Sequence, residues 1–135
     1  MRVVLDTNVV VSMLLDTPAL RPLYEAFRSG LIEPVVTDET LDELHEVLSR
    51  PELKIDAEAR EEFLAVLQLR ALRIANPVLV TERSDPGDNA VLGAALSAHA
   101  VLVTGDLALR RLHPFRQMIP ILSPRHFLAW LSTTR

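Results

Sequence analysis

The chain has 135 residues, 49% of them hydrophobic, with no cysteine and a formal net charge of −4. This length fits one domain over residues 1–135, and the apolar content excludes general disorder. The lack of cysteine excludes a disulfide framework and thiolate chemistry. In the opening segment, Asp6 and Asp16 interrupt the apolar run, which excludes a membrane span of about 20 apolar residues. A signal peptide would need a small-residue cleavage site after the apolar run, and none is seen there. We therefore expect a soluble, cytoplasmic protein.

Strands and helices are predicted to alternate along the chain. Short apolar, β-branched runs predict strands, and apolar residues at helical spacing predict helices. The predicted strands cover residues 2–5, 34–37, 100–104 and 119–122, with a weaker one within 73–80. The predicted helices cover residues 20–31, 38–50, 56–72, 88–99 and 124–131. This alternation predicts an α/β fold with a central parallel sheet covered on both faces, and it leaves the strand order open.

Three places mark expected helix ends in the first half of the chain. Thr37 or Asp38 is expected to cap the helix that ends near Arg50, before Pro51, and Asp56 is expected to cap the next helix. Ser29-Gly30 is expected to terminate the first predicted helix.

Charge is unevenly distributed along the chain. Residues 1–106 hold all 18 acidic and nine of the 14 basic side chains, a net charge of −9. Residues 107–135 hold five arginines and no acid. Thirteen of the 14 basic residues are arginine, which binds phosphate through paired hydrogen bonds better than lysine does. The basic end therefore fits either a polyanionic partner or a solvated basic surface.

Four acidic residues occupy the same kind of place in the predicted fold. Asp6 and Asp106 end strands, Asp88 opens a helix, and Glu43 lies one turn into the helix that follows the second strand. Ligands of open parallel α/β sheets bind beyond the carboxyl ends of the strands. We therefore expect Asp6, Asp88 and Asp106 near one rim of the sheet.

Helical geometry separates Glu43 from the neighbouring acids. The apolar stripe of its helix contains Leu41, Leu44 and Leu48, and at about 100° per residue Glu43 lies at the edge of that stripe. The other acids of this helix point further outward. Glu43 is therefore the acid of this helix expected to face the crevice.

Clustered carboxylates repel one another unless protons or cations compensate them. A hard divalent cation such as Mg²⁺ or Mn²⁺ takes oxygen ligands and keeps part of its water shell. Such an ion can orient a phosphate and lower the pKa of a bound water. Asn8 and Thr104 lie beside two of the acids and can supply neutral oxygen contacts to metal, water or phosphate.

Each acid also has a purely structural explanation. Asp88 and Asp106 can serve as helix N-caps, which stabilise by about 0.5–2 kcal/mol. The segment Asp85-Pro86-Gly87 is ordinary turn chemistry. Asp6 is hardest to explain this way, because an acid that closes a buried apolar strand is unfavourable without a partner.

These residues together resemble a known family. The segments LDTNV, TLDELHEVL, DPGDN and VLVTGD, in this order, are similar to those of PIN-domain nucleases. More narrowly, DPGDN and the closing PILSPRHFLAWL look like the PIN subfamily of toxins from toxin–antitoxin pairs. The resemblance extends over the whole chain.

The resemblance implies an α/β/α sandwich and a ribonuclease that depends on Mg²⁺ or Mn²⁺. The acidic quartet of the family maps onto Asp6, Glu43, Asp88 and Asp106. Asn8 and Thr104 match polar positions that support this site, and Asp85 matches an additional acid of the subfamily. Asp6, Asp88 and Asp106 are expected to bind the metal. Glu43 is expected to orient a metal-bound water or to complete the metal shell.

The same resemblance implies an RNA substrate, with products that carry a 3′-hydroxyl and a 5′-phosphate. Arg110, Arg111 and Arg116 become the candidates for binding the RNA backbone. Toxins of the VapC type usually form homodimers and are silenced by a cognate antitoxin. The apolar helices at 20–31 and 63–72 add support for a dimer.

Two positions depart from the pattern of the family. Related sequences often carry a second acid where this chain has Ala108, and an acid or a lysine where it has Gly87. Neither change removes a member of the quartet. The loss at Ala108 leaves the number of metal ions open.

Other functional classes fit the sequence less well. The four histidines show no metal-ligand pairing, and no GxSxG, P-loop or GxGxxG motif is present. A haloacid-dehalogenase-like phosphatase requires a second acid where Asn8 stands. The main alternative is a catalytically silent PIN domain that binds RNA or protein.

Overall fold

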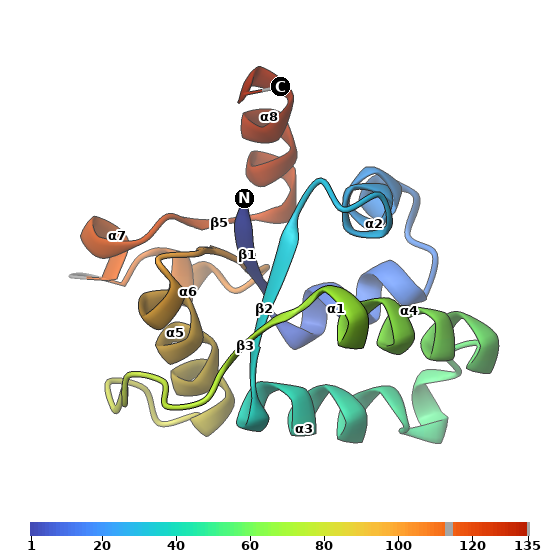
Figure 1. Cartoon of the computed structure of the whole chain (residues 1–135), viewed down its shortest axis with the longest axis horizontal. Coiled ribbons are helices and arrows are strands. Elements are labelled where there is room, and N and C mark those ends of the chain that lie inside the picture. Colours follow the sequence, from blue (N-terminus) through green and yellow to red (C-terminus); the bar gives the residue numbers. More distant parts are fainter. Residues whose placement is uncertain (113–114, 135) are drawn as a thin grey trace.

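A five-stranded parallel sheet forms the centre of the molecule (Figure 1). The structure, a computed structural model, describes residues 1–112 and 115–134, with the backbone alone for 116, 117 and 134. The strands are β1 (Arg2–Leu5), β2 (Glu33–Thr37), β3 (Leu72–Ile74), β4 (Val101–Val103) and β5 (Ile121–Leu122). Their order across the sheet is β3-β2-β1-β4-β5, and all neighbours are parallel.

Helices cover both faces of this sheet. They are α1 (Thr7–Leu14), α2 (Arg21–Arg28), α3 (Asp38–Leu48), α4 (Ala57–Arg70), α5 (Pro86–Ala98), α6 (Leu107–Arg110), α7 (Phe115–Met118) and α8 (Pro124–Thr134), with 3₁₀ turns η1 (Pro18–Leu20) and η2 (Pro51–Leu53). One apolar cluster joins the sheet to α1–α4 and α8, and a second joins it to α5–α7. The expected three-layer α/β/α sandwich is thereby confirmed. No helix in the described part of the chain is long and apolar enough to cross a bilayer.

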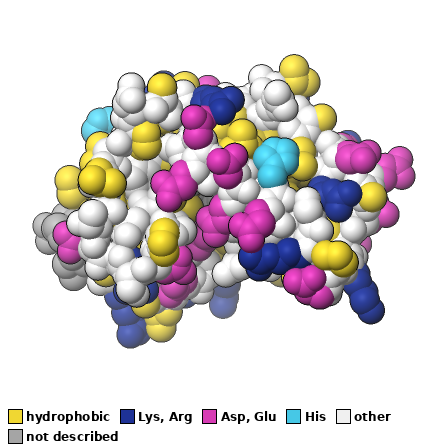
Figure 2. All heavy atoms as spheres, turned by 90° about the horizontal axis from the view of Figure 1, so that it is seen from below, with side chains coloured by type: hydrophobic (Ala, Val, Ile, Leu, Met, Phe, Trp, Pro, Cys, Tyr) yellow, Lys and Arg dark blue, Asp and Glu magenta, His cyan; other side chains and the backbone are white. Residues whose placement is uncertain are grey.

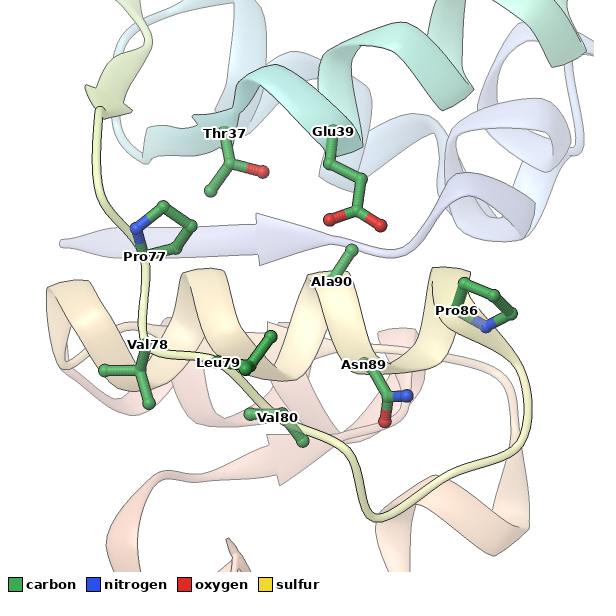
Figure 3. A pocket seen from close by; sticks show the side chains of 9 residues that line it. All are labelled: Thr37, Glu39, Pro77, Val78, Leu79, Val80, Pro86, Asn89 and Ala90. Carbon is green, nitrogen blue, oxygen red and sulfur yellow. The ribbon is translucent and has the colours of Figure 1, made fainter.

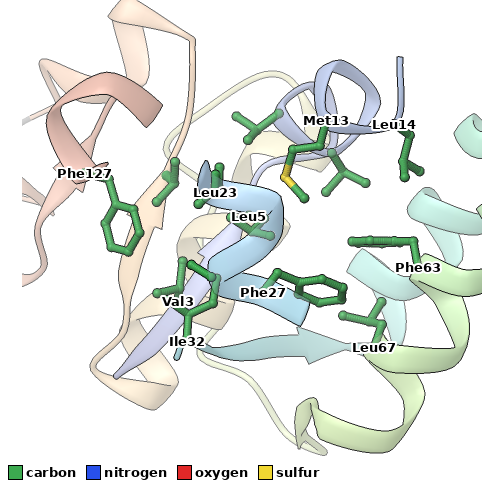
Figure 4. Close-up of a cluster of buried hydrophobic side chains, with 14 of the residues drawn as sticks. Val3, Leu5, Met13, Leu14, Leu23, Phe27, Ile32, Phe63, Leu67 and Phe127 are labelled. Atoms are coloured by element: carbon green, nitrogen blue, oxygen red, sulfur yellow. The ribbon is translucent and has the colours of Figure 1, made fainter. Parts of the chain in front are cut away.

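The two layers of core follow from the alternation of side chains along β1. Val3 and Leu5 point into the larger cluster, whereas Val4 points into the cluster beneath α5. In the larger cluster, shown in Figure 4, Phe27 and Phe63 lie next to each other. Their rings stack with centroids 4.7 Å apart. Both rings are fully buried, and each such side chain stabilises the fold by about 1.5–3 kcal/mol.

Predicted caps set the helix starts. Thr37 and Thr40 form a reciprocal capping box at α3, with N···O distances of 3.1 and 2.8 Å. The Asp56 side chain accepts from Ala59 N and caps α4. Helix α2 ends just before Ser29-Gly30, and Gly30 has a φ angle of 81°, in the left-handed region that favours glycine. These expectations are confirmed.

The sequence patterns miss or misplace several elements. They do not predict α1, because its β-branched valines disfavour a helix in isolation. Burial of Val9, Val10 and Met13 in the core overrides this preference. They also miss the four-residue helices α6 and α7, and place the strand within 73–80 instead of Leu72–Ile74. Helix α5 starts at Pro86 with Asp85 as its N-cap, so the expected start at Asp88 is wrong.

The strand order creates a switch point between β1 and β4. The chain builds β2 and β3 on one side of β1, then returns to build β4 and β5 on the other. Ligand crevices of open α/β sheets lie where the strand order reverses in this way. At this point Asp6 N donates to Val103 O at 3.0 Å, so the residues that follow β1 and β4 lie side by side. Asp6 and Thr104 are therefore neighbours at the carboxyl edge.

A segment without helix or strand, residues 75–85, is fastened to α5. Val78 N donates to Ser97 Oγ at 2.7 Å, and Ser97 Oγ donates to Gly93 O at 2.7 Å. A Cβ atom on Gly93 would lie 2.5 Å from Val78 O, which is closer than real contacts allow. Gly93 is thus required for the close approach of this segment to the helix.

We expect Gly93→Ala to lower the free energy of unfolding by about 1–3 kcal/mol, because the methyl group collides with backbone. The gain in helix propensity, at most about 1 kcal/mol, opposes only part of this loss. Urea unfolding measures the difference. Gly105→Ala is the matched control, since a Cβ there meets no described atom within 4 Å, and we expect a change of about 0.5 kcal/mol or less. Equal stabilities of the two variants would contradict the packing argument.

Candidate functional site

Acidic side chains gather at the carboxyl edge of the sheet. Figure 2, which views the molecule from the end where β1 and β2 finish in Figure 1, shows Asp and Glu side chains grouped near the middle of that face. Asp6 lies within electrostatic reach of Asp88 and Asp106. Glu43 lies within reach of Asp6, Asp85 and Asp88. The fold thus brings together residues from the ends of β1 and β4 and from the starts of α3 and α5.

Thr104 connects the two acids that follow the central strands. Its side chain is completely buried, and its Oγ1 donates to Asp6 Oδ2 at 2.6 Å. The same oxygen accepts from Asp106 N at 3.1 Å. Asp106 Oδ1 accepts from Ala108 N at 2.9 Å, so this acid does cap α6. One carboxylate oxygen suffices for the cap, which leaves the other available to a ligand.

Glu43 lies against the first turn of α5 because residue 87 has no side chain. A Cβ atom at Gly87 would lie 2.9 Å from Glu43 Oε1 and 3.2 Å from Asp85 Oδ1. Glu43 also accepts a hydrogen bond from the side chain of Thr7, which is buried. Glycine, where related sequences often carry an acid or a lysine, thus lets Glu43 approach the other acids.

Asp88 is paired with a cation of its own chain. Arg83 Nε lies 3.3 Å from Asp88 Oδ2, and both side chains are partly buried. Asp85, two residues past Arg83, accepts from Gly87 N at 2.8 Å and caps α5. The cap explanation considered for Asp88 therefore applies to Asp85 instead.

Burial raises the pKa of three of the four acids. For Asp6, burial is the largest cause; the hydrogen bonds from Thr104 and from the Thr7 backbone lower the pKa but do not offset burial, and Asp88 and Asp106 raise it further. Burial and then Asp6 raise the pKa of Glu43. Burial also raises the pKa of Asp88, although Arg83 acts in the opposite direction. Loss of water around these acids, together with their mutual repulsion, therefore outweighs the hydrogen bonds and the arginine that favour their charged forms.

The donors of the cluster suit a hard divalent cation. They are carboxylate oxygens with threonine hydroxyls beside them, the ligand types of Mg²⁺ and Mn²⁺. As they stand, the described residues hold no group of three or more His, Asp or Glu side chains arranged around a common ion position. Protein sites for Mg²⁺ commonly use one or two carboxylates and keep several waters, so a closed cage is not required. The residues fit such an ion in chemistry and charge.

Three of the remaining predicted residues can be placed on helices that follow the strands carrying Asp6 and Asp106. Asn8 is exposed on the first turn of α1, directly after the strand end that carries Asp6. Arg111 is exposed at the end of α6. Arg110 is partly buried, and its Nε has no hydrogen-bond partner among the described residues. The side chain of Arg116 lies outside the described residues.

Sequence reasoning missed two residues of the site. Thr7 stands between Asp6 and Asn8, and its hydroxyl binds Glu43. Arg83 lies five residues before Asp88 and forms the ion pair. Thr7 lies within the LDTNV segment, but nothing in the sequence pairs it with Glu43. Arg83 has no signal of its own, since arginine in a turn is common on protein surfaces.

A small pocket adjoins the acidic cluster without containing it. Its volume is about 240 Å³, and Figure 3 shows it between the start of α3 and α5, beside residues 77–80. Thr37, Glu39 and Asn89 contribute its polar groups. None of the quartet lines this pocket, so the candidate site is the open acidic face.

Comparison with known proteins identifies the family. Residues 2–108 match the PIN domain family, and the chain belongs to that family. The fold is similar to that in a crystal structure of VapBC2 from Rickettsia felis bound to a DNA fragment from their promoter. The TM-score is 0.59 at 20% sequence identity, over 91% of this chain and 98% of the other. Proteins with curated functions yield no match.

The raised pKa of Asp6 predicts how stability changes with pH. A carboxyl group with a raised pKa in the folded state holds its proton more tightly there than in the unfolded state. The contribution of Asp6 to the free energy of unfolding is therefore fully present below the ordinary pKa of 3.8. It is lost as the pH rises through the raised pKa of the folded state. We therefore expect Asp6→Asn, which keeps an acceptor for Thr104, to be more stable than wild type near neutral pH. The difference should shrink toward acidic pH.

Urea unfolding at several pH values measures this effect. Asp42→Asn changes the same charge at an exposed position of α3, so we expect it to alter the pH dependence much less. A stability gain that is the same at acidic and neutral pH would contradict the electrostatic explanation.

Proposed function

We propose that this PIN domain is a metal-dependent endoribonuclease, the toxin component of a toxin–antitoxin pair. The gathering of Asp6, Glu43, Asp88 and Asp106 at the switch point of the sheet is the observation that carries the proposal. Family membership supports nuclease chemistry, and the similarity to the VapBC2 fold supports the toxin assignment. The carboxylate donors support Mg²⁺ or Mn²⁺ as cofactor.

The roles of the acids follow from their surroundings. Asp6, Asp88 and Asp106 would hold the cation, and Thr104 sets the position of the first and last of them through its two hydrogen bonds. A divalent ion bound there supplies Lewis-acid activation of water and compensates the charge of the phosphate.

Glu43 would receive the proton of the attacking water. Burial and neighbouring acids raise its pKa, which makes it a stronger base than an exposed carboxylate, and the Thr7 side chain lies beside it. Water oxygen bonds to phosphorus, the bond from phosphorus to O3′ breaks, and the departing O3′ takes a proton from solvent water, while Glu43 returns its proton to solvent. The products are a 3′-hydroxyl and a 5′-phosphate.

We also propose that residues 1–135 form one PIN domain that acts in the cytoplasm on RNA. Strand β5 and helix α8 lie beyond the matched residues, yet they extend the sheet and supply Phe127 to the core. A homodimer and an antitoxin partner stay predictions from the resemblance. The helices at 20–31 and 63–72 no longer favour a dimer, since Phe27, Phe63 and Leu67 are buried within the molecule.

A silent PIN domain that binds RNA or protein without cleavage is the second candidate. One observation favours it: Arg83 already pairs with Asp88, which reduces the negative charge left to hold a cation. Cleavage and metal binding distinguish the two functions.

Cleavage of a defined RNA by the purified chain, with Mg²⁺, Mn²⁺ or EDTA, tests the proposed activity. We expect EDTA to abolish cleavage and Asp6→Asn to reduce the rate by about 100-fold or more, as for other changes at metal sites. Asp42→Asn, purified identically, should cut like wild type. Equal cleavage by wild type and Asp6→Asn would reveal a contaminating ribonuclease or a wrong site. Inactivity of all proteins without Mn²⁺ binding would favour the silent domain, whereas inactivity with Mn²⁺ binding that depends on Asp6 would indicate that the RNA tested is not the substrate.

Arg111 provides a test of the RNA path. Each phosphate contact on a single strand contributes about 0.7 to the slope of log affinity against log salt. We expect Arg111→Ala to weaken RNA binding and to lower the slope by about that amount. Fluorescence anisotropy over a salt series measures both quantities, with Arg2→Ala, at the amino end of β1, as control. An unchanged slope in Arg111→Ala would remove this arginine from the RNA path.

A further inference from the structure

The ion pair between Arg83 and Asp88 differs from the other ion pairs of the described residues. The side chains of Arg83 and Asp88 are 30% and 16% exposed, whereas every side chain in the other pairs is at least 47% exposed. Exposed pairs contribute little because water screens them. A partly desolvated pair inside an acidic cluster interacts more strongly.

The backbone of Arg83 is held in place independently of its side chain. Arg83 N donates to Asn89 Oδ1 at 3.0 Å, and Asn89 Nδ2 donates to Arg83 O at 2.8 Å. These two bonds fasten the residue to the first turn of α5, next to Asp88. The guanidinium can therefore leave Asp88 without releasing the segment, because the segment does not depend on the ion pair.

We propose that Arg83 is a built-in counter-ion that competes with the divalent cation for Asp88, so that metal binding must displace its guanidinium. This inference rests on the proposed function, since it takes Asp88 as a metal ligand. Two cations on one carboxylate repel each other, and arginine stays protonated at every physiological pH. Arg83 therefore lowers the affinity of the site for metal and is a positioning residue for Asp88.

The competition follows from the arrangement of charge. The described cluster contains Asp6, Glu43, Asp85, Asp88 and Asp106, and Arg83 is the cation that pairs with one of them. In the metal-free protein Arg83 offsets part of their repulsion. When the metal supplies positive charge instead, the guanidinium loses its favourable position at Asp88.

Calorimetric titration of the full chain with MnCl₂ near neutral pH tests the inference. We expect Arg83→Gln to bind Mn²⁺ about three- to tenfold more tightly than wild type, as removal of one partly screened charge pair predicts. Arg83→Lys keeps the charge, and its affinity should stay close to that of wild type. Arg2→Gln is the matched control, because Arg2 also places Nε 3.3 Å from a carboxylate oxygen, that of Glu33, at the amino end of β1.

A second measurement follows Arg83 in the wild-type protein. The Nε–H resonance of Arg83, assigned by its loss in Arg83→Lys, should shift on titration of wild type with Mg²⁺. The shift should saturate at the same concentrations as a backbone amide of the acidic cluster. A resonance that does not move while the site fills would overturn the competition.

The outcomes separate this inference from the proposed function. Tighter Mn²⁺ binding by Arg83→Gln, absent in Arg2→Gln, supports the competition. Unchanged or weaker binding by Arg83→Gln, with wild-type binding that Asp6→Asn abolishes, overturns the inference and leaves the metal site intact. Mn²⁺ binding by none of the proteins, or binding unaffected by Asp6→Asn, overturns both.

Discussion

The hydrogen bond from Thr104 to Asp6 is the contact on which the acidic site depends. It joins the residues that follow β1 and β4, the two strands between which the sheet reverses its order. Leu5 pairs with Val103 in the parallel ladder, so the next residues, Asp6 and Thr104, lie at the same level of the sheet. The hydrogen bond between them therefore follows from the strand register. Without a donor, a carboxylate in this position would remain desolvated and unpaired. With the donor, Asp6 stays in the site although burial raises its pKa.

Helix starts provide the other compensation for negative charge at this edge. Asp6, Asp85 and Asp106 are the N-cap residues of α1, α5 and α6, because every helix that follows a parallel strand begins at the carboxyl edge. The positive end of a helix dipole favours carboxylates by about 0.3–1 kcal/mol. A structural cap and a ligand are therefore not exclusive roles, since the bond from Asp106 to Ala108 uses a single oxygen. The compensation is incomplete, as the raised pKa values of Asp6, Glu43 and Asp88 indicate.

The fold and the acids were predictable from sequence because both depend on local patterns. Short apolar strands, caps such as Thr37 and Asp56, and acids placed after strands need only near neighbours in the chain. Helix α1 was not predictable, because its valines become helical only through burial against the sheet. The same limit applies to Thr7 and Arg83. Their partners, Glu43 and Asp88, are brought within reach by tertiary packing and by the turn before α5.

Gly87 and Arg83 together show how one turn adjusts the charge of the site. Gly87 has no side chain, so the Glu43 carboxylate lies close to Asp85 and repulsion within the cluster increases. Arg83, four residues earlier, brings a positive charge to Asp88 and decreases that repulsion. A residue with a side chain at position 87 would force Glu43 away and lessen the need for a counter-ion. The glycine and the arginine are therefore best understood as a pair, in which close packing of acids and their partial neutralisation arise from the same short segment.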